Sequence, residues 1–195
     1  MRRAHLRRMG FYRRALLPVL LAPAIARAQQ TTWLLNQDNA QIGFSARHLG
    51  LFSSHGRFTR FEARLELDAT RTTDALVEGR IQTAAVTLPF PGAEDTLRSP
   101  TYFDSARFPE ARFSGRAVGI TDAGAFTING RMRIRDIEQP FAMTARLAER
   151  RRESQGDVAR FTASGQVQRS AFGMVTDRSF TADAITISVE VQLLV

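Results

Sequence analysis

The stretch DAITISVEVQLL, residues Asp183–Leu194, decides the fold class. Its apolar residues fall on every second position, with polar residues between most of them: Ile185, Ile187, Val189, Val191 and Leu193. Side chains along a β-strand point alternately to its two faces, so a period of two predicts a strand with one buried and one exposed face.

The same alternation recurs along most of the chain. It predicts strands near residues 32–36, 41–48, 57–68, 75–84, 111–120, 125–135, 140–149, 158–169 and 183–194. Asp122-Ala123-Gly124 and Gln155-Gly156-Asp157 fit hairpin turns, whereas Asn129-Gly130 is interpreted as strand because alternation continues through it. Many strands without a long helix predict an all-β protein, an extended antiparallel barrel of about eight strands whose closure removes exposed edges.

One long excursion interrupts this pattern between Leu88 and Pro109. It contains four prolines, which cannot donate backbone hydrogen bonds to a central strand: Pro89, Pro91, Pro100 and Pro109. Short helices are predicted here at residues 94–99 and 102–106.

The apolar parity of the predicted strands includes many small residues: Gly43, Ala63, Gly79, Gly115, Ala117, Ala145, Ala163 and Gly165. A barrel of about eight strands is just wide enough to be filled by side chains or to hold one small ligand. Small inward residues beside Phe and Leu would leave apolar free volume. Alternatively, they pack under the excursion or sit at bends, and the pattern alone leaves both interpretations open.

The N-terminal segment, residues 1–28, predicts a cleaved signal peptide. Arg13 and Arg14 precede the apolar run Ala15–Ile25, and Ala26-Arg27-Ala28 is a small-x-small cleavage site. The run is shorter than the ~20 residues that span a bilayer. Residues 29–195 are therefore expected to form one exported, periplasmic domain.

The charge of the chain is concentrated in this leader. Residues 1–28 hold seven arginines and no acid, whereas the remainder has 20 arginines against 19 acids. A nearly neutral domain argues against a nucleic-acid partner. The chain has no cysteine, which excludes disulfides and thiol catalysis.

Five blocks, taken together and in order, resemble the YceI-like polyisoprenoid-binding proteins: Ile42–Gly50, Gly56–Phe61, Leu97–Pro109, Gly130–Ile134 and Ala163–Met174. The resemblance implies a lipocalin-like barrel, bacterial and usually periplasmic, whose apolar lumen takes a long isoprenoid chain. The chain departs from the family pattern before Leu97, where residues 93–96 read AEDT in place of the family's Arg-Asp-x-His run. The family's polar residues at the pocket mouth are therefore not carried over to this chain, and the resemblance does not fix the exact ligand.

On this basis the chain is expected to bind a polyprenyl or quinone lipid as a periplasmic carrier, storage or stress-related protein, with no required cofactor, no catalytic residues and no metal. A carrier of this kind is expected to touch membranes transiently, and the oligomeric state is left open. Ligand contacts are predicted at twelve side chains: Phe44, His48, Phe61, Leu65, Leu97, Phe103, Ile128, Met132, Phe141, Met143, Phe161 and Phe172.

Two alternatives stay open. An enzyme acting on a lipid could use His48 with acids of the 94–104 segment, namely Glu94, Asp95 and Asp104. More often such acids cap short helices, a role that Ser99 would also suit. The third interpretation is a structural barrel with a filled core and no ligand.

Overall fold

The computed structural model describes residues 30–68, 71–120, 125–154 and 156–194. The predicted leader and the Asp122-Ala123-Gly124 turn lie outside these residues. The described elements are β1 (Gln30–Leu35), β2 (Ala40–His48), β3 (Phe52–Phe58), β4 (Phe61–Asp68), β5 (Arg71–Gln82), β6 (Val86–Thr87), α1 (Ala93–Arg98), β7 (Glu110–Ile120), β8 (Ala125–Ile134), β9 (Ile137–Glu153), β10 (Gly156–Gln168), the 3-10 turn η1 (Arg169–Phe172) and β11 (Thr181–Leu194).

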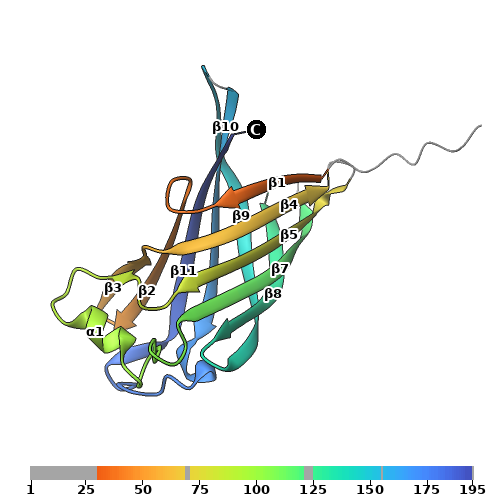
Figure 1. The fold of residues 1–195 in the computed structure, drawn as a ribbon. Helices are drawn as coiled ribbons and strands as arrows, with labels where there is room; N and C mark the ends of the chain where they lie inside the picture. Colours follow the sequence, from red (N-terminus) through yellow and green to blue (C-terminus); the bar gives the residue numbers. More distant parts are fainter. Residues whose placement is uncertain (1–29, 69–70, 121–124, 155, 195) are drawn as a thin grey trace, which may run out of the picture.

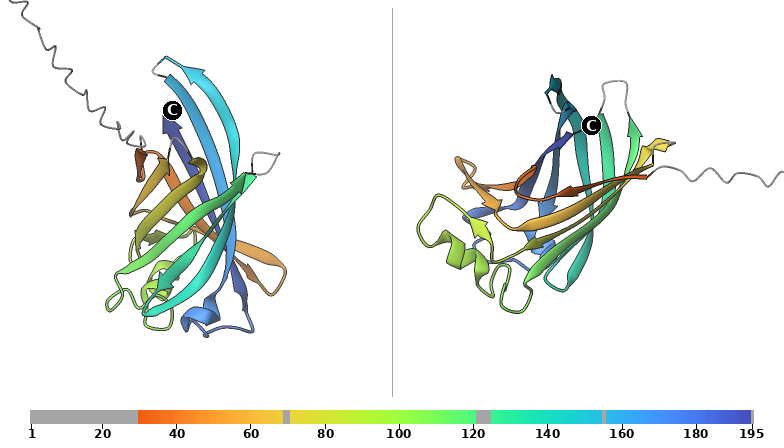
Figure 2. Two further views of the ribbon diagram at one scale, coloured as in Figure 1. Left: turned by 90° about the vertical axis from the view of Figure 1, so that its right-hand side faces the viewer. Right: turned by 45° about the horizontal axis from the view of Figure 1, so that its top comes forward.

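All these strands belong to one antiparallel sheet with the order β1-β4-β5-β7-β8-β9-β10-β11-β2-β3-β6. The sheet curls around a central space (Figures 1 and 2). The connections β1–β2 and β3–β4 join strands from its two edges. Across this seam the indole Nε1 of Trp33 donates to the Leu194 carbonyl at 3.2 Å, and the Gln192 amide donates to the Asn39 carbonyl at 2.8 Å.

The predicted all-β, barrel-like antiparallel fold is therefore confirmed, with corrections. In the described residues β1 and β6 remain the two edges of the sheet, so strand pairing does not close the barrel as predicted. The described residues form eleven strands, where about eight were expected. The strand predicted over residues 57–68 is two strands, because the chain turns at Thr59-Arg60. Asn129-Gly130 lies inside β8, as predicted. Residues 93–98 form a helix, but residues 102–106 form turns and no helix.

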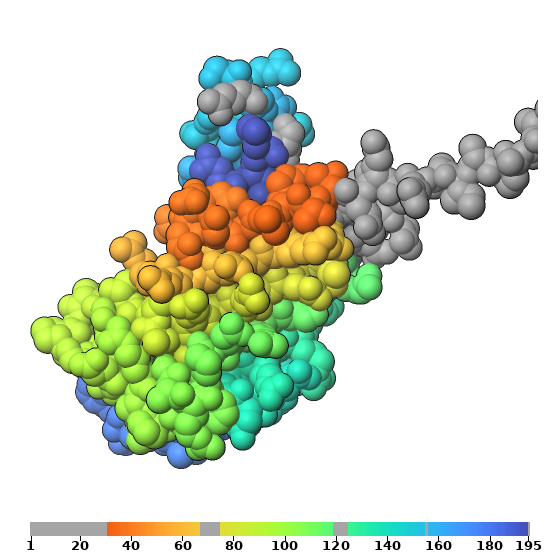
Figure 3. Space-filling view, in the orientation of Figure 1, coloured from red at the N-terminus to blue at the C-terminus, as the bar shows by residue number. Residues whose placement is uncertain are grey.

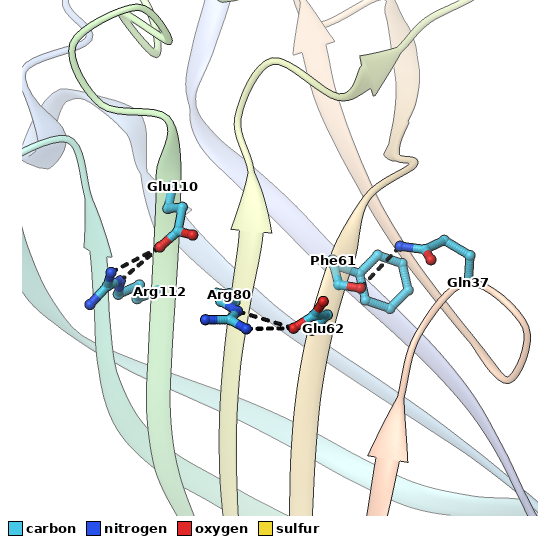
Figure 4. Close-up of polar contacts among 6 residues, drawn as sticks. All are labelled: Gln37, Phe61, Glu62, Arg80, Glu110 and Arg112. Carbon is cyan, nitrogen blue, oxygen red and sulfur yellow. Dashed lines mark hydrogen bonds and ion pairs between the residues drawn. The ribbon is translucent and has the colours of Figure 1, made fainter.

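The outer face of the barrel carries ion pairs between charged side chains of the alternate parity. Figure 4 shows Arg80 of β5 reaching Glu62 of β4 at 2.6 Å, and Arg112 pairing with Glu110 at 2.9 Å within β7. Exposed pairs of this kind contribute little, about 0–1 kcal/mol each. They keep the outer surface polar, and the apolar side chains at the alternate strand positions face inward.

Two arginines, Arg131 and Arg133, are exposed on β8, but Arg135 does not continue their row. Arg131 pairs with Glu138 on the neighbouring strand. Arg135 instead lies in the β8–β9 turn with a φ of 59°, and its guanidinium carbon sits 5.7 Å from the centre of the Phe108 ring. The two-residue turn removes Arg135 from the strand alternation.

Three phenylalanine rings cover glycines on the inner face. A Cβ at Gly165 would lie 2.8 Å from the Phe141 ring and 2.4 Å from the Ala142 carbonyl. Similarly, the Phe113 ring covers Gly115, and the Phe44 ring covers Gly56. These glycines give the rings a flat surface to pack on, so they do not contribute free volume.

The turn η1 is held to β11 by one carboxylate. Asp183 accepts the Ser170 hydroxyl at 2.5 Å and the Ser170 amide at 2.8 Å. The Ser170 hydroxyl is the main reason that the pKa of Asp183 lies below its ordinary value of 3.8. A carboxylate whose pKa is lower in the folded state stabilises the fold above the unfolded pKa and loses this effect as the pH falls through the folded pKa.

Replacing Asp183 with asparagine is therefore expected to lower the free energy of unfolding at neutral pH by about 1–2 kcal/mol. The difference from the wild type should shrink below pH 3.8, where the carboxyl groups become protonated. Denaturant unfolding measured across this pH range checks the prediction, with Asp38→Asn on the exposed β1–β2 turn as the control. A difference that stays constant with pH would show that the charge of Asp183 is irrelevant.

Candidate functional site

The inside of the barrel is hollow. A cavity of about 1010 Å³ runs between its walls, at the upper end of the range for small-molecule sites. Side chains of every strand from β1 to β11, β6 excepted, line it together with the α1 segment, and most of them are apolar. A filled core is therefore wrong for this barrel.

Eleven of the twelve predicted contact residues lie on the cavity wall: Phe44, His48, Phe61, Leu65, Leu97, Phe103, Ile128, Met132, Phe141, Met143 and Phe161. Whether they touch a ligand stays a prediction. Phe172 does not line the cavity. It belongs to η1 and is 1% exposed within the core that also contains Ile134 and Val167, because the turn at the end of β10 directs it behind the wall.

The small residues divide into three groups. Ala63, Gly79, Ala117, Ala145 and Ala163 line the cavity. Gly115 and Gly165 lie under phenylalanine rings, as described above. Gly43 was assigned to the wrong face, since a Cβ there would meet the Ser188 hydroxyl on the outer side. Only the alanines and Gly79 of the first group therefore contribute free volume to the cavity.

The cavity opens at the α1 end of the barrel. Its exposed apolar lining residues are Phe90, Pro91 and Gly92 on one side and Phe52 and Phe180 on the other. We call this opening the mouth. At the inner end, buried Leu35, Ala40, Phe61 and Leu193 pack together with Trp33, so a chain entering at the mouth would run toward these residues.

The excursion is anchored beside the mouth by polar contacts. The fully buried Thr83 hydroxyl donates to the Phe108 carbonyl at 2.8 Å. The Arg98 guanidinium donates to the Ala84 carbonyl at 2.9 Å, and the Tyr102 hydroxyl donates to Asp177 at 3.1 Å. Burial, followed by this hydrogen bond, raises the pKa of Tyr102. The three contacts hold one side of the mouth against β5 and the loop before β11.

A small polar cluster lies inside the mouth. His48 Nε2 is 2.8 Å from the Ser54 hydroxyl, and His48 Nδ1 is 3.1 Å from the Thr181 hydroxyl. The rings of Phe52 and Phe180 lie 5.1 and 5.2 Å from the imidazole. All five side chains line the cavity.

The hydrogen bonds of this cluster leave one hydroxyl proton without an acceptor in the cluster. A neutral imidazole donates from one ring nitrogen and accepts at the other. One hydroxyl must therefore accept from His48, and its own proton is not used by the imidazole. The cluster can donate one O–H to a ligand oxygen, and the hydroxyl lone pairs can accept from a ligand O–H.

Arg169 is a second buried polar side chain on the wall. It is 3% exposed and donates to the carbonyls of Met174, Thr176, Thr181 and Ala182 at 2.5–3.2 Å. Four backbone acceptors occupy most of the five N–H groups of a guanidinium. Arg169 therefore fixes the loop between η1 and β11, which carries Phe180 and leads into Thr181.

The acids proposed for catalysis are not among the hydrogen-bond partners of His48, which are Ser54 and Thr181. Glu94 and Asp95 both pair with Arg98 at 3.0 Å, and Asp104 lies 3.5 Å from Arg107. The Thr87 hydroxyl is the main cause that holds the pKa of Glu94 below its ordinary value. None of these acids caps a helix N-terminus: α1 begins after Gly92, while Ser99 ends it by donating to the Thr96 carbonyl at 2.6 Å.

The two described histidines, His48 and His55, point to opposite faces of the sheet. His48 faces the lumen, whereas His55 occupies the alternate, exposed parity of β3. Within the described ranges, no group of three or more His, Cys, Asp or Glu side chains is placed to hold a metal ion. The same residues include no helix long and apolar enough to cross a membrane.

Several lining residues were missed by the sequence interpretation. Phe52, Ser54 and Phe58 share one parity of β3, so the alternation was available to find them. Phe180 and Thr181 had no local signal, because they meet His48 only through the pairing of β11 with β2.

Comparison with known proteins agrees with this architecture. The YceI-like domain model matches residues 33–193. The chain belongs to the YceI-like family. Relatives include UPF0312 proteins of Shewanella denitrificans, 28% identical over 81% of this chain and 83% of the relative, and of Photorhabdus laumondii, 27% identical over 80% of this chain and 79% of the relative.

Solved structures of similar fold cover most of this YceI-like chain. BcnA of Burkholderia cenocepacia is 18% identical, with a TM-score of 0.69 over 79% of this chain and 96% of that one. A polyisoprenoid-binding domain from Saccharophagus degradans, implicated in plant cell wall breakdown, is 10% identical, with a TM-score of 0.55 over 84% of this chain and 98% of that one. At these identities the likeness shows the fold.

Proposed function

We propose that this YceI-like protein binds one long isoprenoid lipid, of the polyprenyl or quinone type, inside its barrel, and serves as a periplasmic carrier or store for it. The observation that carries the proposal is the largely apolar cavity of about 1010 Å³ with the His48 cluster beside its mouth. The polyisoprenoid-binding domain of similar fold supports it.

The physics of such binding needs few polar contacts. Each buried CH₂ group contributes about 0.8 kcal/mol, so a branched hydrocarbon tail gains affinity along its whole length. The wall offers aromatic and aliphatic side chains from opposite parts of the sheet, among them Phe44, Ile128 and Phe161. The tail would extend from the mouth toward Trp33 and Leu35 at the inner end.

The His48 cluster sets the orientation in this proposal. Its spare hydroxyl proton would donate to an oxygen of the ligand head group, and Phe52 and Phe180 would flank that group. An uncharged carbonyl or hydroxyl oxygen fits because it needs one donor and no counter-ion. The tail then occupies the part of the lumen without polar groups.

A ligand series tests this function. Affinity for polyprenols should rise with chain length and level off once the cavity is full, as measured by native mass spectrometry or by quenching of Trp33 fluorescence. A saturated chain of equal length should bind similarly, because the wall recognises apolar surface. Affinity that is independent of chain length would contradict a lumen site.

Replacing His48 with leucine removes the imidazole that orients the Ser54 and Thr181 hydroxyls. Binding of a quinone or polyprenol should therefore weaken by about tenfold, the equivalent of about one hydrogen bond. Binding of a pure hydrocarbon of the same length should change little. Equilibrium binding of both ligands checks this, with His55→Leu on the outer face of β3 as the matched control. Equal losses for both ligands would mean that His48 only shapes the cavity and that its cluster does not bind the head group.

A further inference from the structure

The mouth is surrounded by exposed apolar side chains. The described part of the chain exposes ten large hydrophobic residues, and six of them belong to the three segments around the mouth. We call these six the mouth rim: Leu49, Leu51, Phe52, Phe90, Val175 and Phe180. Clustered exposed apolar residues of this kind mark interaction sites more often than scattered ones do.

Three contacts hold the rim together. The Leu49 amide donates to the Phe180 carbonyl at 2.9 Å, the Phe52 and Phe180 rings lie 6.3 Å apart, and Tyr102 ties the excursion to Asp177. Leu51, at 84% exposure, and Leu49, at 57%, project from the β2–β3 turn without lining the cavity. Nothing inside the barrel requires these two leucines.

The rim continues directly into the lumen. Phe52, Phe90 and Phe180 are half exposed and also line the cavity. A lipid leaving the lumen would therefore pass from one apolar surface to another. Figure 3 shows the excursion in yellow-green at the end of the molecule opposite the β9–β10 tip, and Figure 1 places the loop before β11 beside it.

Two arginines beside the rim are available to an anionic surface. Arg47, next to the β2–β3 turn, is exposed and forms no ion pair among the described residues. Arg178 is also exposed and reaches Asp183 only at 3.9 Å. Asp177, the acid within this loop, accepts a hydrogen bond from the Tyr102 hydroxyl, and Glu94 and Asp95 of α1 both pair with Arg98. At the opposite end, by contrast, Arg150 and Arg152 both pair with Asp157.

We propose that the mouth rim docks on an anionic lipid bilayer, with Leu49 and Leu51 inserted among the lipids and Arg47 against their head groups, so that the lipid ligand passes between membrane and lumen without entering water. This inference rests on the proposed function. A rim that inserts side chains by 5–10 Å is typical of proteins bound at a membrane interface. The partner is thus the membrane from which the ligand is drawn.

The test is partitioning of the purified protein onto vesicles of phosphatidylcholine with phosphatidylglycerol, followed by flotation. The double variant Leu49→Asp/Leu51→Asp should bind at least about tenfold more weakly, since each buried leucine contributes about a tenfold factor. The matched control is Leu34→Asp/Leu147→Asp, which removes two exposed leucines away from the mouth. Arg47→Gln should lower binding about fivefold, the equivalent of about 1 kcal/mol per basic residue, and only on vesicles that contain phosphatidylglycerol.

A second readout separates this inference from the proposed function. Lumen binding of a polyprenol, measured without vesicles, should be equal in the wild type and the Leu49→Asp/Leu51→Asp variant, while its transfer between vesicles should slow in the variant. Equal partitioning of all variants, or a wild type that does not float, would overturn the docking surface. The inference would also be overturned if the wild type does not bind vesicles and sediments as a dimer while the Leu49→Asp/Leu51→Asp variant sediments as a monomer. The rim would then join two copies of the chain. Failure of the proposed function would instead appear as no polyprenol bound in either protein.

Discussion

Replacing Phe172 with alanine is expected to lower the free energy of unfolding by about 3–5 kcal/mol. Phe172 is 1% exposed in the packed core behind the cavity wall, and the turn that carries it is fixed by Asp183 and by Gly173 at a φ of 77°. Its removal would leave an enclosed void. Chemical denaturation of the ligand-free protein measures the loss.

Phe161→Ala is the matched variant. Phe161 lines the existing cavity and touches Phe126 across 6.4 Å between ring centres. Because its ring already faces open space, its removal should cost clearly less stability than removal of Phe172, while weakening lipid binding more. Equal costs for the two substitutions would show that the lumen is closed and packed in solution.

Filling the lumen should have the largest effect on binding. Ala63→Phe combined with Ala163→Phe adds two rings to the wall of the cavity. The variant is expected to lose at least about a hundredfold in affinity for a long isoprenoid, since burial of only four CH₂ groups of the tail contributes about 3 kcal/mol. Its stability should fall by no more than the ~1–3 kcal/mol typical of overpacking.

The control for this variant lies on the same strand. Ser164→Phe adds a ring of the same size to the exposed face of β10, one residue from Ala163. It should bind lipid as the wild type does. Gly165 is not suitable for filling, although its parity suggests it, because a Cβ there would already collide with Phe141 and the Ala142 carbonyl. If the filled barrel folds and binds lipid unchanged, the ligand lies elsewhere.

Much of the fold follows from local patterns. In β11 the alternation from Ile185 to Leu193 predicts both the strand and its inward face. The turn at Thr59-Arg60, which separates β3 from β4, was not predicted, although the sequence contains a signal for it. Inward residues occupy even positions from Phe52 to Phe58 and odd positions from Phe61 to Leu65, and a shift of one residue in a period of two cannot occur within one regular strand.

The site was harder to predict because it depends on distant contacts. Parity assigned His48 to the inner face, but its hydroxyl partners are Ser54, six residues away, and Thr181, 133 residues away. The ring positions over Gly56, Gly115 and Gly165 depend on side-chain directions across neighbouring strands. Glycine parity alone therefore overestimated the free volume, and only the alanines and Gly79 on the wall supply it.

The most direct test of the central claim is native mass spectrometry of the protein isolated from its own cells without detergent washing. The account predicts one bound lipid per chain, of isoprenoid mass, that is absent from the Ala63→Phe/Ala163→Phe variant and present in Ser164→Phe. A wild-type protein that carries no lipid, and takes up none when incubated with polyprenols or quinones, would contradict the account.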